Sequence, residues 1–436
     1  MDYSKNTREE LVNFCKAQKI KGYSKKSKGE IIDLLVKDNV TPPVSAPLVS
    51  APPVSAPLVS APPVSAPLVS APLVSAPLVS APLVSAPPVK RLNYIGSKFQ
   101  LLEWISMRMC EKTGWTAFDG KRIADLFAGT GIVSHHFRTQ NALVFANDAE
   151  LYSAVITHAF TRSCYSLTCA ALIKQLQTEI STNMHINMVG FITEKYSPFN
   201  GNERMFFTIE NARRIDYLRQ RIEDLQISDE DDYKFLLASL LLSADAVSNV
   251  PAVYGCYLKN FKAKALKNLD FVPIHTIPQC AAPASKVFNQ DVLSDVLLGQ
   301  LPELDLVYLD PPYNERQYSK NYFPLNMIAL TPIQQRQEMP LKGKTGIPES
   351  CFLSPFCRKN DVEAAFDKLF KRLDSKWIFL SYNSESLVPR EKMLALLGKY
   401  GTVSINEKPY KRFKSFEYNE DKEICEYLFC LEKQKK

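Results

Sequence analysis

The 436-residue sequence lacks the features that mark membrane, secreted and metal-binding proteins. It has no run of about 18 apolar residues, the length that crosses a membrane, and its first residues are polar and charged, unlike a signal peptide. The ten cysteines include no Cys-x-x-Cys pair, and the five histidines form no metal-ligand pattern. We therefore expect an intracellular, soluble protein with reduced thiols and no bound metal.

The chain divides into three parts of different composition. Residues 1–40 are charged, with apolar residues at helical spacing, and predict two short helices joined by a basic turn. Residues 41–89 repeat Val-Ser-Ala-Pro-Leu or Val-Ser-Ala-Pro-Pro without charge. Prolines at this density block helices and interior strands, so we expect a disordered, polyproline-like linker. Residues 90–433 are long enough for one large globular domain.

A glycine-rich turn follows a short predicted strand in the large part. Residues 122–126 predict the strand, Phe127-Ala-Gly-Thr-Gly131 the turn, and Ile132 the start of a helix. Glycine lets the backbone turn sharply and approach a ligand closely, and a helix N-terminus favours an anion. The turn has neither the third glycine of a dinucleotide fingerprint nor a following Lys-Ser/Thr pair for a triphosphate.

A second predicted strand, residues 142–148, ends in Asp148. A carboxylate at this place can accept hydrogen bonds from ribose hydroxyls. Together with the glycine turn, it indicates a nucleoside ligand without phosphates, and S-adenosylmethionine fits because it combines a ribose, an adenine and an amino-acid tail. Other nucleotide-binding α/β domains share the glycine turn and stay open as an alternative.

The turn Asn93-Tyr94-Ile95-Gly96-Ser97-Lys98 precedes both strands. Lys98 is a candidate partner for the carboxylate of the donor, and Tyr94 is a candidate packing surface. A surface turn with a solvated lysine is the alternative interpretation of the same residues.

The tetrapeptide Asp310-Pro311-Pro312-Tyr313 ends the apolar run of residues 304–309. A carboxylate and a backbone carbonyl can accept both hydrogens of an exocyclic amine, the tyrosine ring can stack on a base, and the prolines stiffen the turn. Methyl transfer to a base amine needs this geometry, because the nitrogen lone pair is conjugated into the ring. Pro-Pro-Tyr after an acid also occurs in ordinary loops and in proline-rich ligands.

In order and spacing, the motifs at 94–98, 127–131, 147–148 and 310–313 resemble the D12 class of adenine-specific DNA methyltransferases, the family of the Dam enzymes. The resemblance covers residues 90–433. It implies an enzyme that transfers a methyl group from S-adenosylmethionine to the N6 amine of an adenine flipped out of duplex DNA.

The same resemblance implies the fold and the roles of individual residues. The fold would be α/β, a doubly wound Rossmann-like methyltransferase sheet with a mainly helical target-recognition insert at about residues 155–285. The catalytic residues would be the tetrapeptide, in which Asp310 and the Pro311 carbonyl bind the amine and Tyr313 stacks on the base, with Pro312 between them. The expected contacts of the methyl donor are Tyr94, Gly96, Lys98, Asp125, Phe127, Gly129, Gly131, Asp148, Asp291 and Asp310. Asp291 is equally compatible with a helix N-cap.

DNA contacts are expected in two regions, and the net charge of +7 suits a polyanionic partner. Residues 1–40 resemble a SAP-type DNA-binding module, although a helical hairpin for protein contact stays open. The linker is either a tether that concentrates DNA near the enzyme or an expanded repeat with little role. The residues expected to touch DNA are Lys25, Lys26, Lys28, Lys259, Lys262, Lys264, Asn314, Arg316 and Tyr318.

Three other functions remain compatible with the sequence. An RNA base amine can be methylated by the same tetrapeptide, and N4-cytosine enzymes share it, although they more often begin it with Ser where this chain has Asp310. A non-enzymatic DNA tether with a decayed pocket is the third. We expect a monomer, with double-stranded DNA and a restriction nuclease of the same site as candidate partners.

Overall fold

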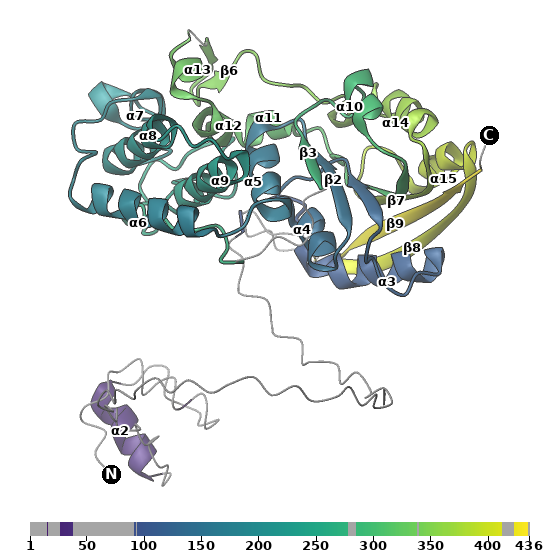
Figure 1. Ribbon diagram of the computed structural model, residues 1–436, viewed down its shortest axis with the longest axis horizontal. Helices are drawn as coiled ribbons and strands as arrows, with labels where there is room; N and C mark the ends of the chain where they lie inside the picture. Colours follow the sequence, from purple (N-terminus) through teal and green to yellow (C-terminus); the bar gives the residue numbers. More distant parts are fainter. Residues whose placement is uncertain are drawn as a thin grey trace, which may run out of the picture. The chain divides into compact units, whose positions relative to one another are not determined.

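The computed structural model describes residues 15, 27–37, 91–92, 94–277, 285–337, 340–411 and 423–434. The chain forms two compact units, residues 1–81 and 82–436. In the first unit, helix α2 spans Lys28–Lys37 (Figure 1). Its start is capped reciprocally, because the Ser27 amide and hydroxyl donate to the Glu30 carboxylate, and the Glu30 amide donates to Ser27 Oγ.

Helix α2 corresponds to the second helix predicted for residues 1–40. Of the first predicted helix, only Cys15 lies in the part of the chain that the structure describes. Lys25, Lys26 and the whole predicted linker 41–89 lie outside it.

A seven-stranded sheet forms the centre of the second unit, in the order β3-β2-β1-β4-β7-β9-β8 (Figure 1). Strands β3, β2, β1, β4 and β7 are parallel to one another, and β9 runs antiparallel to its neighbours β7 and β8. The strands are β1 (Arg122–Asp125), β2 (Leu143–Asn147), β3 (Lys286–Phe288), β4 (Leu304–Leu309), β7 (Ser375–Asn383), β8 (Gly401–Lys411) and β9 (Glu423–Lys433). The doubly wound α/β sheet expected from the sequence is confirmed.

Two apolar cores cover the two faces of this sheet. Along β4, Leu306 and Tyr308 belong to one core and Val307 and Leu309 to the other, because successive side chains of a strand point to opposite faces. Both faces are therefore buried, as in other parallel sheets. The helices beside the sheet are α3 (Leu102–Thr113), α4 (Ile132–Thr139), α5 (Leu151–Thr161), α10 (Asp295–Gln300), α14 (Val362–Arg372) and α15 (Arg390–Gly398).

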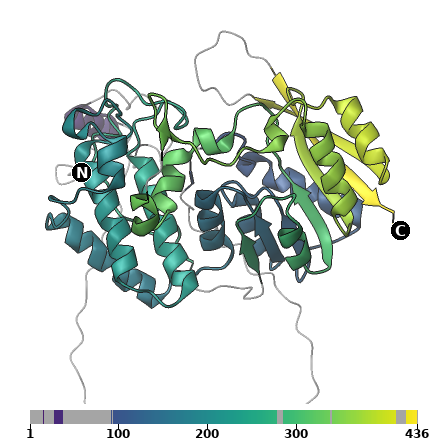
Figure 2. The same ribbon diagram turned by 90° about the horizontal axis from the view of Figure 1, so that it is seen from above.

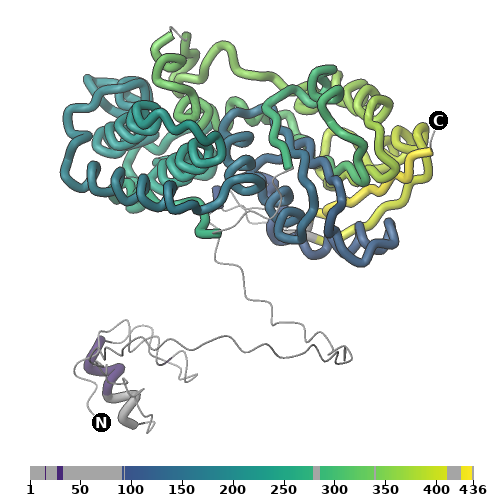
Figure 3. The backbone as a smooth tube through the Cα atoms, viewed as in Figure 1, coloured from purple at the N-terminus to yellow at the C-terminus, as the bar shows by residue number. Residues whose placement is uncertain are grey.

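A helical lobe lies beside the sheet in both views (Figures 1 and 2). The chain leaves the sheet after α5 and returns at β3, as Figure 3 traces. The lobe contains α6 (Leu167–Ser181), α7 (Phe191–Tyr196), α8 (Ile209–Asp224), α9 (Glu230–Ala246), α11 (Tyr318–Asn321), α12 (Phe323–Ala329), α13 (Pro332–Arg336) and the hairpin β5 (Leu341–Lys342) and β6 (Ile347–Pro348). Three short 3-10 turns complete the regular elements: η1 (Phe99–Leu101), η2 (Phe199–Gly201) and η3 (Pro355–Cys357).

Helix α9 is the centre of the lobe, since its residues 235–245 are all buried. The lobe agrees with the mainly helical stretch expected at about residues 155–285. After β4 and the tetrapeptide, the chain enters the lobe again through α11 and α12.

The cysteines differ from expectation at one position. Eight of them are free thiols, as the sequence predicted, but Cys164 is disulfide-bonded, so the prediction is wrong for that residue. No helix within the described ranges is long and apolar enough to cross a membrane. Within the same ranges, no cluster of His, Cys, Asp and Glu could hold a metal ion.

Asp216 of α8 fastens two helices of the lobe. Its carboxylate accepts hydrogen bonds from the backbone amides of Gly190, Ile192 and Thr193 at 3.2, 3.0 and 2.8 Å, which satisfies the open N-terminus of α7. The side chain is 3% exposed. Among the described residues, no other side chain accepts a hydrogen bond from these three amides.

We predict that Asp216→Ala lowers the free energy of unfolding by about 2–4 kcal/mol, because it leaves buried amides without acceptors. Asp224→Ala on the same helix is the control: its side chain is 45% exposed, and its contacts are a surface ion pair with Arg221 and an exposed hydrogen bond from Gln220. Urea unfolding monitored by circular dichroism compares the two variants. Equal stability of the two variants would contradict the role of Asp216.

Candidate active site

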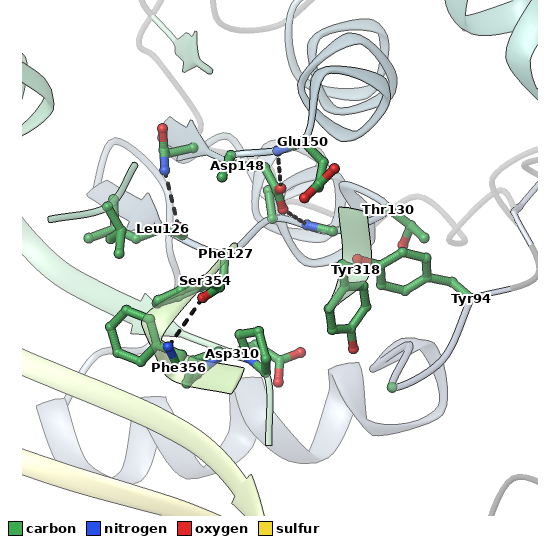
Figure 4. A pocket seen from close by; sticks show the side chains of 18 of the residues that line it. Tyr94, Leu126, Phe127, Thr130, Asp148, Glu150, Asp310, Tyr318, Ser354 and Phe356 are labelled. Atoms are coloured by element: carbon green, nitrogen blue, oxygen red, sulfur yellow. Dashed lines mark hydrogen bonds between the residues drawn. The ribbon is translucent and has the colours of Figure 1, made fainter. Parts of the chain in front are cut away.

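A cavity opens beside the carboxyl ends of β1, β2 and β4 (Figure 4). Here the strand order reverses, because the chain goes from β1 outward to β2 and β3 and then returns to β4 on the other side. Ligands of open α/β sheets bind at such a switch point. The cavity is lined by short segments far apart in the sequence: 94–98, 126–130, 147–150, 291–292, 310–313, 317–318, Phe352, Ser354 and Phe356.

The predicted glycine turn is held by Asp148. Its Oδ2 accepts a hydrogen bond from the Gly129 amide at 2.8 Å and its Oδ1 accepts one from the Glu150 amide at 2.9 Å (Figure 4). Gly129 has a φ of +55°, and a Cβ there would lie 3.0 Å from the Tyr94 ring. Burial raises the pKa of Asp148, although the amide donors act against this. Asp148 thus fixes the turn. Because it also lines the cavity, its carboxylate oxygens can accept further hydrogen bonds from a ligand.

Two residues expected to contact the donor do not line the cavity. Gly131 begins α4 with a φ of +72°, and a Cβ there would lie 2.8 Å from the backbone Cα of Thr157, so it lets α4 pack against α5. Asp125 is 1% exposed and accepts a hydrogen bond from Ser134 Oγ at 2.7 Å. Burial raises the pKa of Asp125 to about 7. Both residues support the turn from behind.

Three tyrosines attach the turn 94–98 to the segment after the tetrapeptide. The Tyr94 ring stacks on Tyr322 at 4.9 Å between centroids and lies 5.3 Å from the ring of Tyr318. The Ile95 amide donates to the Tyr322 hydroxyl at 3.0 Å, and the Tyr318 hydroxyl donates to the Ile95 carbonyl at 3.2 Å. Tyr318, a predicted DNA contact, therefore forms part of the cavity wall (Figure 4).

Tyr313 of the tetrapeptide packs against the backbone of Gly96. Gly96 has a φ of +80°, and a Cβ there would lie 2.9 Å from the Tyr313 hydroxyl oxygen. The main chain of Tyr313 is also fixed, since its carbonyl accepts a hydrogen bond from the Leu387 amide at 3.0 Å. The first motif and the tetrapeptide are thus in direct contact.

Lys98 lies between two carboxylates. Its ammonium nitrogen is 3.0 Å from Asp310 Oδ1 and 3.7 Å from Glu426 Oε2, and its side chain is 2% exposed. Burial would lower the pKa of Lys98, but the two carboxylates raise it well above its usual value. Burial raises the pKa of Asp310 to about 6, and Lys98 opposes that shift. The sequence suggested that Lys98 binds the carboxylate of the donor, but in the structure its ammonium group is already paired with Asp310 and Glu426.

Asp291 lines the cavity, and its Oδ1 accepts a hydrogen bond from the Leu293 amide at 3.0 Å. The N-cap of the following helix α10 is Ser294, so the alternative interpretation of Asp291 as that cap is wrong. Its second carboxylate oxygen has no hydrogen bond among the described contacts and is available to a ligand.

Two carboxylates of the site were missed in the sequence. Glu150 lines the cavity, is 6% exposed and accepts a hydrogen bond from Asn326 Nδ2 at 2.5 Å. Burial raises the pKa of Glu150 to about 8. Glu426 stands on β9, far downstream of every recognised motif. The position of Glu150, two residues after Asp148, could have predicted that it belongs to the site. No motif in the neighbouring sequence predicts the same for Glu426.

The residues proposed for DNA binding differ in exposure. Lys28, Lys259 and Arg316 are exposed. Lys262 donates to the Val250 carbonyl and is half-buried. Lys264 is also half-buried and donates to Asp245 O at 3.2 Å and Ser248 Oγ at 3.3 Å, and the Asn314 side chain accepts a hydrogen bond from the Arg316 amide at 3.0 Å.

The mainly parallel sheet with a cavity at its switch point gives the protein a Rossmann-like α/β architecture. The tetrapeptide at the rim of this cavity narrows the class further. The chain belongs to the D12 class N6 adenine-specific DNA methyltransferases, whose family model matches residues 94–396.

Curated relatives agree with this family. The chain is 40% identical over 342 residues to the Type II methyltransferase M.CviAII of Paramecium bursaria Chlorella virus 1, covering 78% of this chain and 98% of that protein. It is 37% identical over 349 residues to M.NlaIII of Neisseria lactamica, covering 78% and 99%. It is 32% identical over 361 residues to M.FokI of Planomicrobium okeanokoites, covering 78% and 53%.

The protein is a site-specific DNA methyltransferase that uses S-adenosylmethionine to methylate the N6 amine of adenine. The family, fold, activity and donor inferred from the sequence are confirmed. The RNA, N4-cytosine and non-enzymatic alternatives are set aside. The family match begins at residue 94, so the SAP-type resemblance of residues 1–40 stays a prediction.

We predict that Gly129→Ala weakens binding of S-adenosylmethionine by about tenfold or more, because the new methyl group strains a left-handed residue and displaces the Tyr94 ring. Gly120→Ala is a matched control, since Gly120 also has positive φ but nothing within 4 Å of the added Cβ. Isothermal titration calorimetry measures both. Equal donor affinities in the two variants would exclude the contact as the cause.

Proposed function

We propose that Asp310 and the Pro311 carbonyl accept the two N6 hydrogens of a flipped adenine, while Tyr313 stacks on its ring. One observation carries this proposal: the tetrapeptide and the glycine turn 127–131, at the ends of two neighbouring strands, meet at a single cavity. An amine held at the tetrapeptide and a sulfonium methyl group held beside the turn are then close enough to react.

The residues of the cavity fit the donor. Asp148 is the candidate partner of the ribose hydroxyls and Asp291 of the donor adenine, because both line the cavity and have acceptor capacity left. Tyr94 and Phe127 supply apolar walls. S-adenosylmethionine supplies the electrophilic methyl group.

The hydrogen bonds from the amine to Asp310 and Pro311 direct the nitrogen lone pair out of the ring and toward the methyl group. The amine becomes cationic when the C–N bond forms, so its proton can pass to water and no strong base is needed. Positioning supplies most of the rate. Asp310 must be ionised to serve as an acceptor for both the amine and Lys98.

DNA contacts are proposed for the exposed cations first. Lys259 and Arg316 are exposed and can reach phosphates, and the exposed Lys28 would contact phosphates from the first unit, together with Lys25 and Lys26. Lys262 and Lys264 can contribute charge while their ammonium groups hold the 245–250 loop. Asn314 and Tyr318 would support the flipped nucleotide from the rim and wall of the cavity.

The relatives named Type II methyltransferase or modification methylase lead to a proposal for the biological role. The protein would act as a monomer and methylate the recognition site of a cognate restriction nuclease, so that the nuclease cannot cut it. Residues 1–40 would be a SAP-type module that holds DNA near the catalytic domain, with 41–89 as its tether.

We predict that Asp310→Ala lowers kcat by about 1,000-fold or more, because the amine loses its charged acceptor. DNA affinity should stay within a factor of about two, since phosphate contacts supply most of it. Transfer of a labelled methyl group to duplex DNA, together with a binding assay, measures both. Asp305→Asn is the control: Asp305 lies on β4 before the tetrapeptide, pairs with the Arg122 side chain of β1, and accepts a hydrogen bond from the Arg122 amide that asparagine can also accept. Turnover of Asp310→Ala near that of the control would refute the role.

We predict that deletion of residues 1–89 leaves kcat unchanged but weakens DNA affinity, with a smaller dependence of binding on salt. Each lost phosphate contact removes about one unit from the slope of log K against log salt concentration. Fluorescence anisotropy over a salt series compares the deletion with the full chain. An identical slope and affinity would assign residues 1–40 to another role.

A further inference from the structure

Glu426 is a buried carboxylate close to the tetrapeptide but outside the cavity. It is 7% exposed, lies on β9 opposite Asn383 of β7, and does not line the cavity. Among the residues that the structure describes, its buried Oε2 has no hydrogen-bond partner, and the cation within 4 Å of it is the Lys98 ammonium at 3.7 Å. A buried carboxylate oxygen without a hydrogen bond destabilises the fold, which makes Glu426 a candidate for a functional role.

Lys98 connects this carboxylate to the reaction centre. The ammonium nitrogen is 3.0 Å from Oδ1 of Asp310, a residue that lines the cavity, and 3.7 Å from Oε2 of Glu426, which does not line it. The Gly96 carbonyl is 3.4 Å away and holds the ammonium between the two. A shift of less than about 1 Å would exchange the hydrogen bond to Asp310 for one to Glu426.

The bond between Lys98 and Asp310 competes with the proposed substrate contact. An ammonium bound to a carboxylate withdraws electron density from it, so the carboxylate becomes a weaker acceptor for a neutral amine. A second carboxylate within reach of the ammonium removes this conflict. One cation shared by two carboxylates leaves a net negative charge, which the incoming amine hydrogens can use at Asp310.

We propose that Glu426 is a positioning residue that takes up the Lys98 ammonium when the adenine amine reaches Asp310. The Asp310 carboxylate then keeps its charge for the amine, and Lys98 remains neutralised by Glu426. The proposal rests on the role of Asp310 given above. It concerns Glu426, which acts on the base only through Lys98.

Glu426→Gln tests the proposal, because glutamine keeps the size of the side chain and removes its charge. Lys98 then stays on Asp310, and kcat should fall by about tenfold while the KM for S-adenosylmethionine changes less than about twofold. Glu432→Gln is the matched control on the same strand, since Glu432 forms a half-exposed ion pair with Lys376. The control should keep the wild-type kcat.

The pH profile separates positioning from mere structural support. The charged or titratable groups that face Asp310 are Lys98, Glu426, Tyr308, Tyr318 and Asp125. The negative charge of Glu426 adds to the burial that raises the pKa of Asp310 to about 6, while Lys98 acts against both. Removal of the Glu426 charge should therefore move the acid limb of the kcat profile to lower pH, whereas a loss of packing alone would leave that limb in place.

Glu426→Asp retains the charge at a shorter reach. It should keep the acid limb at the wild-type pH and have a kcat between wild type and Glu426→Gln, and it carries the test alone if the glutamine variant does not fold. A wild-type kcat in both variants, an equal loss of kcat in both, or an unshifted acid limb in Glu426→Gln would overturn the proposal. If Asp310→Ala keeps its turnover, the role of Asp310 itself fails instead.

Discussion

The parallel register of β1 and β4 is the constraint on which the site depends. Asp125 pairs with Tyr308, and the Leu126 amide donates to the Tyr308 carbonyl at 3.2 Å, so both strands end at the same level of the sheet. The glycine turn and the tetrapeptide leave the sheet from these two ends. Because the next elements diverge to opposite sides, the space between them stays open, and it becomes the cavity in which donor and base amine can meet.

Two glycines, which have no side chain, shape this cavity as much as the larger residues around it do. The Tyr94 ring lies 3.0 Å from the position that a Cβ of Gly129 would take, and the Tyr313 hydroxyl lies 2.9 Å from that of Gly96. The turn 94–98 thereby contacts both the glycine turn and the tetrapeptide, and the tyrosines of α11 and its C-cap hold it there. Dense packing of this kind keeps the reacting groups in one geometry, which methyl transfer without a strong base requires.

Local patterns predicted what local chemistry controls. The strand expected at 142–148 is β2, and the acid at its end lies in the cavity because strand ends of a parallel sheet share one edge. Asp125 and Gly131 were expected to face the donor as well. The sequence pattern does not distinguish these two residues from Asp148 and Gly129. Only the folded turn decides that Asp148 and Gly129 line the cavity and that Asp125 and Gly131 do not. Likewise, the pattern that predicts a DNA contact for Lys264 does not reveal the hydrogen bond that its ammonium group donates to the Asp245 carbonyl.

The sequence by itself determined the family, the donor and the tetrapeptide, because motifs of fixed order carry that chemistry in a few adjacent residues. It also determined the α/β sheet, since alternating apolar runs and glycine turns allow few other folds. Only the tertiary structure decided that Lys98 faces two carboxylates, that Glu426 joins the site and that Tyr318 and Tyr322 hold the first motif. These contacts join residues far apart in the chain, and their partners are chosen by the packing of whole elements rather than by any local pattern.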